Sequence, residues 1–216
     1  MLVLGDGLSS ALSSVLCIGA HSDDIEIGCG GTVLKLVAAN PDLAVHWVVL
    51  SADGTRADEA RASAERFLDG AAKVDVEVLT FRERYFPHLA ELKEFFDDLG
   101  SRVRPDIVLT HHQGDVHQDH RATAELTWNT FRDHLILEYE IPKYDGDLGR
   151  PNAFVGLDEE TAHAKTKAIV EGFPSQAERY WFTAETFLAL MRVRGIEARA
   201  PSGFAEAFHA KKIVLL

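Results

Sequence analysis

The sequence predicts an α/β protein with a Rossmann-like, mostly parallel sheet that carries helices on both of its faces. Apolar runs of strand length alternate with helical segments through the first half of the chain, and only short links separate them. Such alternation is typical of parallel strands joined by helical crossovers. The 216 residues, of which 46% are hydrophobic and 26% charged, are enough to build a core. We therefore predict a single domain over residues 1–216.

The first half of the chain supplies four strands and three helices in alternation. Short runs rich in Val, Leu and Ile predict the strands, at 14–20, 44–51, 74–81 and 106–110. Helical spacing of apolar residues, or enrichment in Ala, Glu and Arg, predicts the helices, at 30–40, 55–70 and 88–104. Pro41 and Gly70 stand where the first two of these helices should stop.

The second half of the chain is less regular. Its helices are predicted at 123–135, 158–173 and 175–194, and its strands at 136–141 and 205–215. Acids open the segment 158–173 and Lys residues follow, as the helix dipole prefers. Ser175 and Glu178 have capping-box spacing, and Gly195 is expected to end that helix. Turn residues between 142 and 152 predict a loop.

Charge and composition exclude several classes of function. The formal net charge is −12, so we expect no nucleic-acid partner, because phosphate contacts need an excess of Lys and Arg. We also expect no stable membrane insertion, since no stretch approaches the ~18 uninterrupted apolar residues of a spanning helix. Residues 1–20 lack a basic start, which argues against a signal peptide and for a cytoplasmic protein. Cys17 and Cys29 are expected to be buried thiols without a disulfide framework.

Two polar clusters follow two of the predicted strands. “HSDD” begins at His21, directly after the strand at 14–20, and “HQDH” ends at His120, shortly after the strand at 106–110. Ligands of parallel α/β sheets bind at the carboxyl ends of the strands. Both clusters are therefore expected at one edge of the sheet, where they would meet.

These clusters contain the residue types of a metal site. His21, Asp24 and His120 offer two imidazole nitrogens and one carboxylate, and a catalytic zinc keeps its fourth position open for water. The same set also suits Fe²⁺ in a facial arrangement. Asp23 could take a proton from that water. His117 precedes His120 by one helical turn and could stabilise developing negative charge.

Other interpretations of these motifs remain open from the residues alone. Asp119 is a candidate to orient an imidazole. “SDD” before a helix is also a common capping sequence, and a lone His at a strand end is usually an ordinary polar residue. “GCGGT” resembles the dinucleotide fingerprint, but Val33 occupies its last position and no acid ends the strand at 44–51. We therefore do not predict nucleotide binding.

The two clusters carry a resemblance to a known family. “AHSDDIEIGCGGT” resembles the signature A-H-P-D-D-x-E-x-G-C-G-G-T of the LmbE-like (PIG-L) zinc deacetylases. “THHQGDVHQDHRAT” is similar to their second motif, which ends in H-x-D-H. The tail, “SQAERYWFTAETFLALMRVRG” followed by “FAEAF”, is similar too, so the resemblance spans nearly the whole chain. Ser22 stands where Pro is usual, but Pro donates no ligand, so the implied chemistry is unaffected.

The resemblance implies a role for each matching residue. It makes His21, Asp24 and His120 the zinc ligands and Asp23 the general base. Protonated His117, supported by Asp119, would stabilise the oxyanion. Arg56 would contact the substrate, with Arg61 as its competitor, and Glu26 would be structural. The remaining polar residues of the second motif are expected to lie outside the metal site: His111, His112 and Asp115.

The implied reaction is removal of an N-acetyl group from an amino-sugar-type small molecule, releasing acetate and a free amine. A homo-oligomer is an open expectation, because relatives form trimers or hexamers. Two alternatives remain: a zinc amidase that cuts another acyl amide or conjugate, and a non-catalytic metal-binding pathway protein. The presence of Asp23 argues against the second, since a scaffold needs no base beside its metal.

Overall fold

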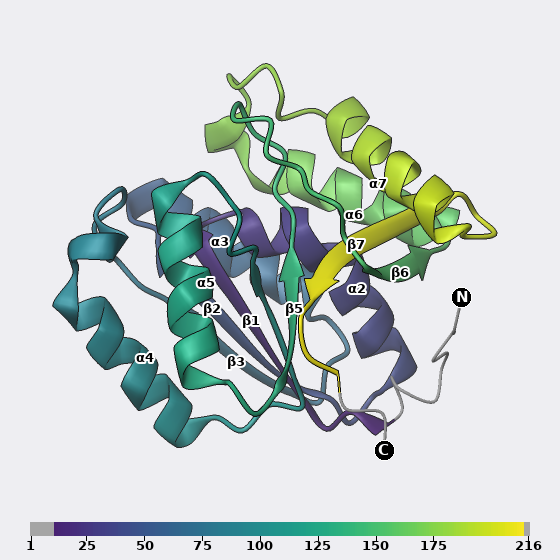
Figure 1. Cartoon of the computed structure of the whole chain (residues 1–216). Coiled ribbons are helices and arrows are strands. Elements are labelled where there is room, and N and C mark those ends of the chain that lie inside the picture. Colours follow the sequence, from purple (N-terminus) through teal and green to yellow (C-terminus); the bar gives the residue numbers. More distant parts are fainter. Residues whose placement is uncertain (1–10, 214–216) are drawn as a thin grey trace.

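A seven-stranded sheet organises residues 11–213, the part of the chain that the computed structural model describes (Figure 1). The strand order is β3-β2-β1-β4-β5-β7-β6. The strands from β1 to β5 run parallel, whereas β7 is antiparallel to both of its neighbours. Their bounds are β1 Ser14–His21, β2 Ala44–Ser51, β3 Lys73–Val78, β4 Ile107–His111, β5 Leu135–Tyr139, β6 Ala153–Leu157 and β7 Phe204–Ala210.

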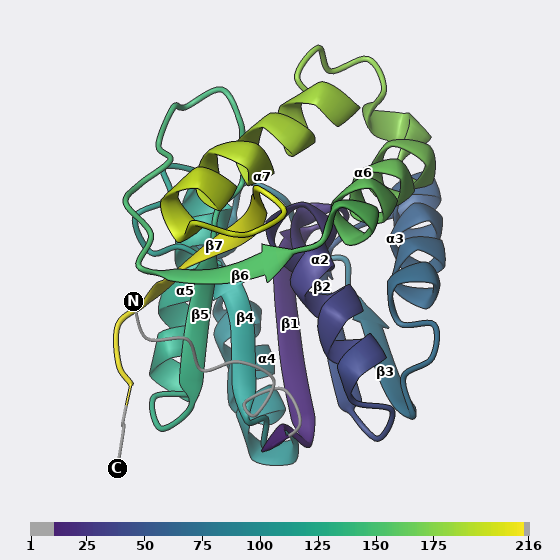
Figure 2. The same ribbon diagram turned by 90° about the vertical axis from the view of Figure 1, so that its right-hand side faces the viewer.

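Helices cover both faces of this sheet (Figures 1 and 2). One core packs against α2, α3 and α6, and the other packs against α4 and α5. Strand β1 contributes side chains to both cores. Val15 and Cys17 belong to the first core, whereas Leu16 and Ile18 belong to the second. The helix bounds are α2 Asp24–Ala39, α3 Gly54–Phe67, α4 Ala90–Arg102, α5 Gln118–Thr130, α6 Glu159–Gly172 and α7 Ala184–Ala198, with short 3₁₀ turns η1 Phe86–His88 and η2 Pro174–Gln176.

The predicted fold class is confirmed, but several elements differ from the sequence expectation. Helix α5 spans Gln118–Thr130 and not the predicted 123–135. Helix α2 begins at Asp24, well before the predicted 30–40, so the first polar cluster opens a helix. Strand β6 was not predicted. The helix expected from residue 175 begins only at Ala184, where the Thr183 side chain accepts a hydrogen bond from the Thr186 backbone N–H at 3.3 Å.

Ser175 and Gly195 therefore have other roles than those expected. The Ser175 hydroxyl donates to the Glu59 carboxylate on α3 instead of capping a helix. Gly195 lies inside α7, and a Cβ there would come within 2.0 Å of the Gly203 carbonyl oxygen. It is needed for close packing against the turn before β7, and the helix continues to Arg199, which closes it in the left-handed conformation (φ 55°).

The structure also describes the two cysteines and the lengths of the helices. Cys17 and Cys29 are buried and free. Among residues 11–213, no helix is long and apolar enough to cross a membrane. The strand expected at 205–215 ends at Ala210, and residues 211–213 are not in a strand. The expectation about a signal peptide depends in part on residues 1–10, and the predicted strand also included residues 214 and 215. Both parts lie outside the described residues.

Candidate metal centre

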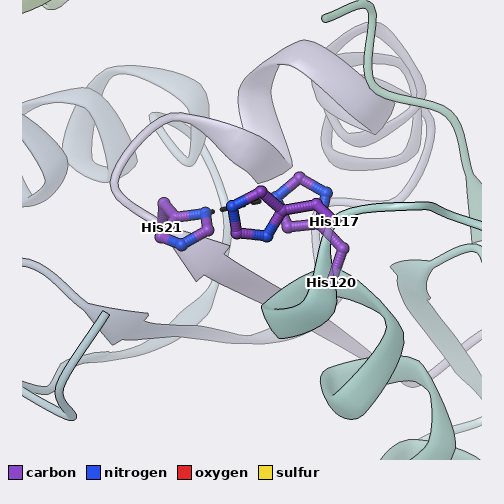
Figure 3. A group of neighbouring side chains, drawn as sticks. All are labelled: His21, His117 and His120. Atoms are coloured by element: carbon purple, nitrogen blue, oxygen red, sulfur yellow. Dashed lines mark hydrogen bonds between the residues drawn. The ribbon is translucent and has the colours of Figure 1, made fainter. Parts of the chain in front are cut away.

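The pairing of β1 with β4 brings the two polar clusters together. The strands run parallel, with Val15 opposite Ile107 and Cys17 opposite Leu109. His21 ends β1, and the chain turns directly into α2 at Asp24. Strand β4 ends at His111, and a short loop leads to His117, the N-cap residue of α5. The imidazoles of His21, His117 and His120 consequently gather at one edge of the sheet (Figure 3).

Three donor atoms at this edge form a nearly equilateral triangle. His21 Nδ1 lies 3.2 Å from His120 Nε2 and 3.3 Å from Asp24 Oδ2, and the last two atoms are 3.5 Å apart. A point equidistant from three atoms so spaced lies about 2 Å from each, the distance at which Zn²⁺ binds imidazole nitrogen and carboxylate oxygen. All three side chains are buried. This donor set therefore fits a zinc ion.

His120 also takes part in two other groups of potential ligands. His21, His117 and His120 form one group, and Asp24, His111 and His120 form another, each with donor atoms within 4.8 Å of one another. His111 was expected outside the site, yet its Nε2 lies 3.1 Å from Asp24 Oδ2 and its ring stacks on His120 at 3.9 Å. The same nitrogen is 3.0 Å from the Ala20 backbone N–H, which places His111 as a support beneath the triangle.

Carboxylates hold the outer nitrogens of two of these imidazoles. Asp115 Oδ2 lies 2.9 Å from His120 Nδ1, which leaves His120 Nε2 facing the triangle. Asp119 Oδ2 lies 3.3 Å from His21 Nε2 and also accepts the Arg84 backbone N–H. Such outer carboxylates fix the ring orientation and tautomer of metal-binding histidines. This role of Asp115 was not predicted, although the residue lies only five positions before His120 in the sequence.

The expected partnership between Asp119 and His117 is different in the structure. The Asp119 carboxylate lies against His21, and only the Asp119 backbone N–H reaches His117, at 3.3 Å from Nδ1. Because Nδ1 accepts this hydrogen bond, a neutral His117 carries its hydrogen on Nε2. Burial, together with the charges of His120 and His21, lowers the pKa of His117. The structure thus favours a neutral donor over the protonated His117 that we expected.

Asp23 occupies the N-cap position of α2 without acting as a cap. Its side chain makes no capping hydrogen bond, so the interpretation of “SDD” as a mere helix cap is not supported. Burial and then the charge of Asp24 raise the pKa of Asp23 to about 6, while the cation of Arg56 opposes this rise. A carboxylate with a pKa near the working pH is suited to accept and return a proton.

Arg56 reaches the site from the first turn of α3, after the neighbouring strand β2. Its Nε donates to Ser22 Oγ at 3.3 Å and its Nη1 to Glu83 Oε2 at 3.1 Å. The hydroxyl of Ser22, which replaces the usual Pro, thereby provides an acceptor for this guanidinium. Arg61 is exposed further along α3. The structure therefore brings Arg56, and not its competitor, beside Asp23.

The glycines of “GCGGT” serve packing. A Cβ at Gly28 would lie 2.2 Å from the Tyr139 ring, one at Gly30 would lie 2.6 Å from Phe67, and one at Gly31 would lie 2.6 Å from Leu157. These residues lie within α2, on the helix that carries Asp24. The stretch is therefore a tight helix contact and not a phosphate-binding turn.

A buried ion pair fixes helix α2, which also carries the buried acid of the first motif. The Gly31 and Thr32 backbone N–H groups donate to Glu206 at 2.8 and 2.6 Å. Lys165 Nζ, 2.6 Å from the same carboxylate, donates to the Ile27 carbonyl oxygen as well. Glu26, also on α2, is fully buried, and this burial raises its pKa to about 8.

Fold and site together define a class: an α/β protein with a buried His/Asp centre, able to hold a divalent metal at the carboxyl edge of a parallel sheet. Residues 16–131 match the PIG-L family, GlcNAc-PI de-N-acetylase, and the chain belongs to this family. This confirms the resemblance that the two motifs carry.

Individual proteins are similar to this chain in sequence or in fold. The uncharacterized deacetylase YaiS of Escherichia coli (strain K12) is 29% identical over 175 residues, which cover 75% of this chain and 92% of YaiS. Among solved structures, the N,N′-diacetylchitobiose deacetylase of Pyrococcus horikoshii has a TM-score of 0.69 at 22% identity, over 93% of this chain and 84% of that one. GalB, the 4-carboxy-2-hydroxymuconate hydratase of Pseudomonas putida KT2440, has a TM-score of 0.75 at 19% identity, over 94% and 98%. These two structural likenesses establish the fold alone.

Proposed function

We propose that the protein is a zinc-dependent N-deacetylase that hydrolyses the N-acetyl amide of an amino-sugar-type small molecule. The observation that carries this proposal is the triangle of His21 Nδ1, Asp24 Oδ2 and His120 Nε2, with Asp23 beside it. Family membership and the described activities of YaiS and the chitobiose deacetylase support the reaction class. Fe²⁺ is the alternative metal for the same ligands.

His21, Asp24 and His120 would hold the ion. When bound, zinc supplies Lewis-acid chemistry, which lowers the pKa of a water molecule and polarises the acetyl carbonyl. The protein side chains must then move a proton and stabilise charge. Each of these tasks falls to a residue next to the triangle.

Asp23 would carry the proton. Its carboxylate takes a proton from the attacking water, whose oxygen bonds to the acetyl carbon. The same carboxyl then donates this proton to the amide nitrogen as the C–N bond breaks, and acetate and the free amine leave. The raised pKa of Asp23, about 6, suits both directions of transfer near neutral pH.

His117 would stabilise the oxyanion that develops on the acetyl oxygen. With Nδ1 occupied by the Asp119 backbone N–H, the Nε2–H group is the available donor of a neutral ring. A preorganised donor of this kind typically contributes about 10²–10³-fold in rate. Arg56, beside Ser22 and close to Asp23, is the proposed substrate contact.

The experiment that tests the proposal is acetate release from a panel of N-acetylated amino sugars, with zinc-loaded and chelated protein side by side. We expect release that stops with the chelator and returns with zinc. A second panel, in which the acetyl group is replaced by longer acyl groups, distinguishes a deacetylase from an amidase that cuts another acyl amide. Preference for a longer acyl group would overturn the acetyl assignment. Stoichiometric zinc without turnover of any amide would leave only a metal-binding role.

The cytoplasmic location and a homo-oligomer stay predictions from the sequence.

A further inference from the structure

A buried lysine lies immediately outside the candidate metal centre. Lys143 Nζ lies 3.0 Å from Asp115 Oδ2 and 2.7 Å from Asp147 Oδ1. The three side chains are only 9%, 4% and 8% exposed, so this ion-pair network is largely shielded from water. Ion pairs in such surroundings fix geometry, because separating them would leave charges desolvated and unpaired.

Asp115 connects Lys143 to the candidate metal centre. Its Oδ2 contacts both Lys143 Nζ and His120 Nδ1, and its Oδ1 accepts the His117 backbone N–H at 2.7 Å. Asp147 reinforces the arrangement from the other side, because its Oδ2 accepts the Val116 backbone N–H at 2.7 Å. The loop after β5 is thus fastened to the segment that carries His117 and His120.

We propose that Lys143 is a positioning residue that holds the Asp115 carboxylate against His120 and so fixes His120 Nε2 in the metal-binding triangle. This inference rests on the proposed zinc site. It extends that site to a loop that neither family motif contains. Without the ammonium group, the Asp115 and Asp147 carboxylates would face each other with no cation between them and would repel. Asp115 would then move from His120, whose ring would lose its fixed orientation.

The direction of the effect separates positioning from simple electrostatics. If Coulomb repulsion were the only effect, removal of a positive charge near a dication would tighten metal binding. Loss of positioning weakens it, since outer partners of metal-binding histidines typically contribute about 10–100-fold in affinity. The two explanations predict opposite signs for the same variant.

The test compares K143M, K143R and the control K35M in the full-length protein. Lys35 is exposed and donates to the Gly156 carbonyl on β6, so K35M removes a lysine hydrogen bond without touching Asp115. Zinc affinity is measured by competition with a chromophoric chelator, and ligand geometry by the visible spectrum of the Co²⁺-loaded protein. We expect K143M to raise the zinc Kd about 10–100-fold and alter the cobalt spectrum. K143R should keep most of the wild-type zinc affinity and cobalt spectrum, and K35M should change neither the affinity nor the spectrum.

Further variants keep the inference testable where K143M folds poorly. K143M/D147N removes the repelling carboxylate and should recover part of the lost affinity. D147N alone keeps the Lys143–Asp115 contact and should raise Kd only a few-fold, in the same direction. Unchanged or tighter zinc binding in K143M, with an unchanged cobalt spectrum, would overturn the inference. Absence of zinc binding in the wild type would instead overturn the proposed function, so the two failures are distinguishable.

Discussion

His21 Nδ1 lies 3.2 Å from His120 Nε2, although 99 positions separate the two residues in sequence. Each nitrogen also faces Asp24 Oδ2, at 3.3 and 3.5 Å. Two imidazole nitrogens that face each other with their lone pairs need a proton or a cation between them. The Asp24 carboxylate stabilises positive charge at this point. Without metal it helps to raise the pKa of His21 to about 10 against the opposing effect of burial, and a divalent cation would meet the same negative charge.

Metal should therefore stabilise the folded protein. We expect the thermal unfolding midpoint to fall when the protein is chelated and to rise again with Zn²⁺. At a thousandfold excess of free metal over its Kd, the free energy of unfolding should rise by about 4 kcal/mol. Calorimetry on wild type, H120A and H46A measures this. His46 pairs with Asp75 at a partly buried position of β2, away from the metal centre, so H46A should respond like the wild type. H120A should lose the response, and a response as large as that of wild type would contradict the ligand assignment.

Replacement of Asp23 should separate catalysis from folding. Because the Asp23 side chain does not cap α2, D23N should keep the stability and zinc affinity of the wild type. The deacetylation rate should fall about 10²–10⁴-fold, the range for loss of a general base. Asp53 provides a matched control, since it precedes α3 after the neighbouring strand and also makes no side-chain cap. D53N should retain full activity, and a D23N enzyme with normal kcat would exclude Asp23 as the base.

The sequence predicted the parallel half of the fold well because its signals are local. Buried strands β1, β2 and β4 are continuous apolar runs that can be recognised in the sequence. Because ligands bind at the carboxyl ends of parallel strands, this pattern alone predicted that His21 and His120 would lie at one edge of the sheet. The short strand β6, by contrast, contains Gly156 and follows Pro151, and it pairs only with the distant β7. Such a strand depends on tertiary pairing, and no local pattern indicates it.

The surroundings of the site were harder to predict for the same reason. The family resemblance implied that Asp119 supports His117. The Arg84 and Phe86 backbone N–H groups instead donate to its carboxylate, which lies beside His21. Ser175 had the spacing of a helix cap, but Glu59 on α3 takes its hydroxyl. In both cases a long-range hydrogen bond overrides a local interpretation.

A buried ion pair should make a large contribution to stability. Lys165 Nζ on α6 contacts Glu206 at 2.6 Å, and both side chains are almost fully buried. K165M would leave a buried carboxylate without its cation, and we expect a loss of about 3–5 kcal/mol in the free energy of unfolding. Lys167, two residues further along α6, pairs with Glu171 in solvent at 4.0 Å. K167M should change stability by less than about 0.5 kcal/mol. Urea denaturation of both variants tests this, and equal effects would contradict it.

The stability of the protein should depend on pH through a histidine pair outside the metal centre. His209 on β7 stacks on His112 with ring centroids 3.8 Å apart, and its side chain is 14% exposed. Burial, followed by the charge of His112, lowers the pKa of His209 from 6.5 to about 4, although Glu138 opposes this shift. The folded state thus keeps His209 neutral, while the unfolded chain takes up a proton below pH 6.5.

Protonation therefore opposes folding, and the resulting loss of stability develops as the pH falls from about 6.5 toward 4. At pH 5 these two pKa values correspond to at most about 2 kcal/mol. H209F preserves the stacked ring without a titrating group, so chelated H209F should lose about that much less stability than chelated wild type between pH 7 and 5. H163F, at an exposed position of α6, should follow the wild type. Urea denaturation at the two pH values measures these differences, and parallel loss in wild type and H209F would show that His209 does not stay neutral in the folded protein.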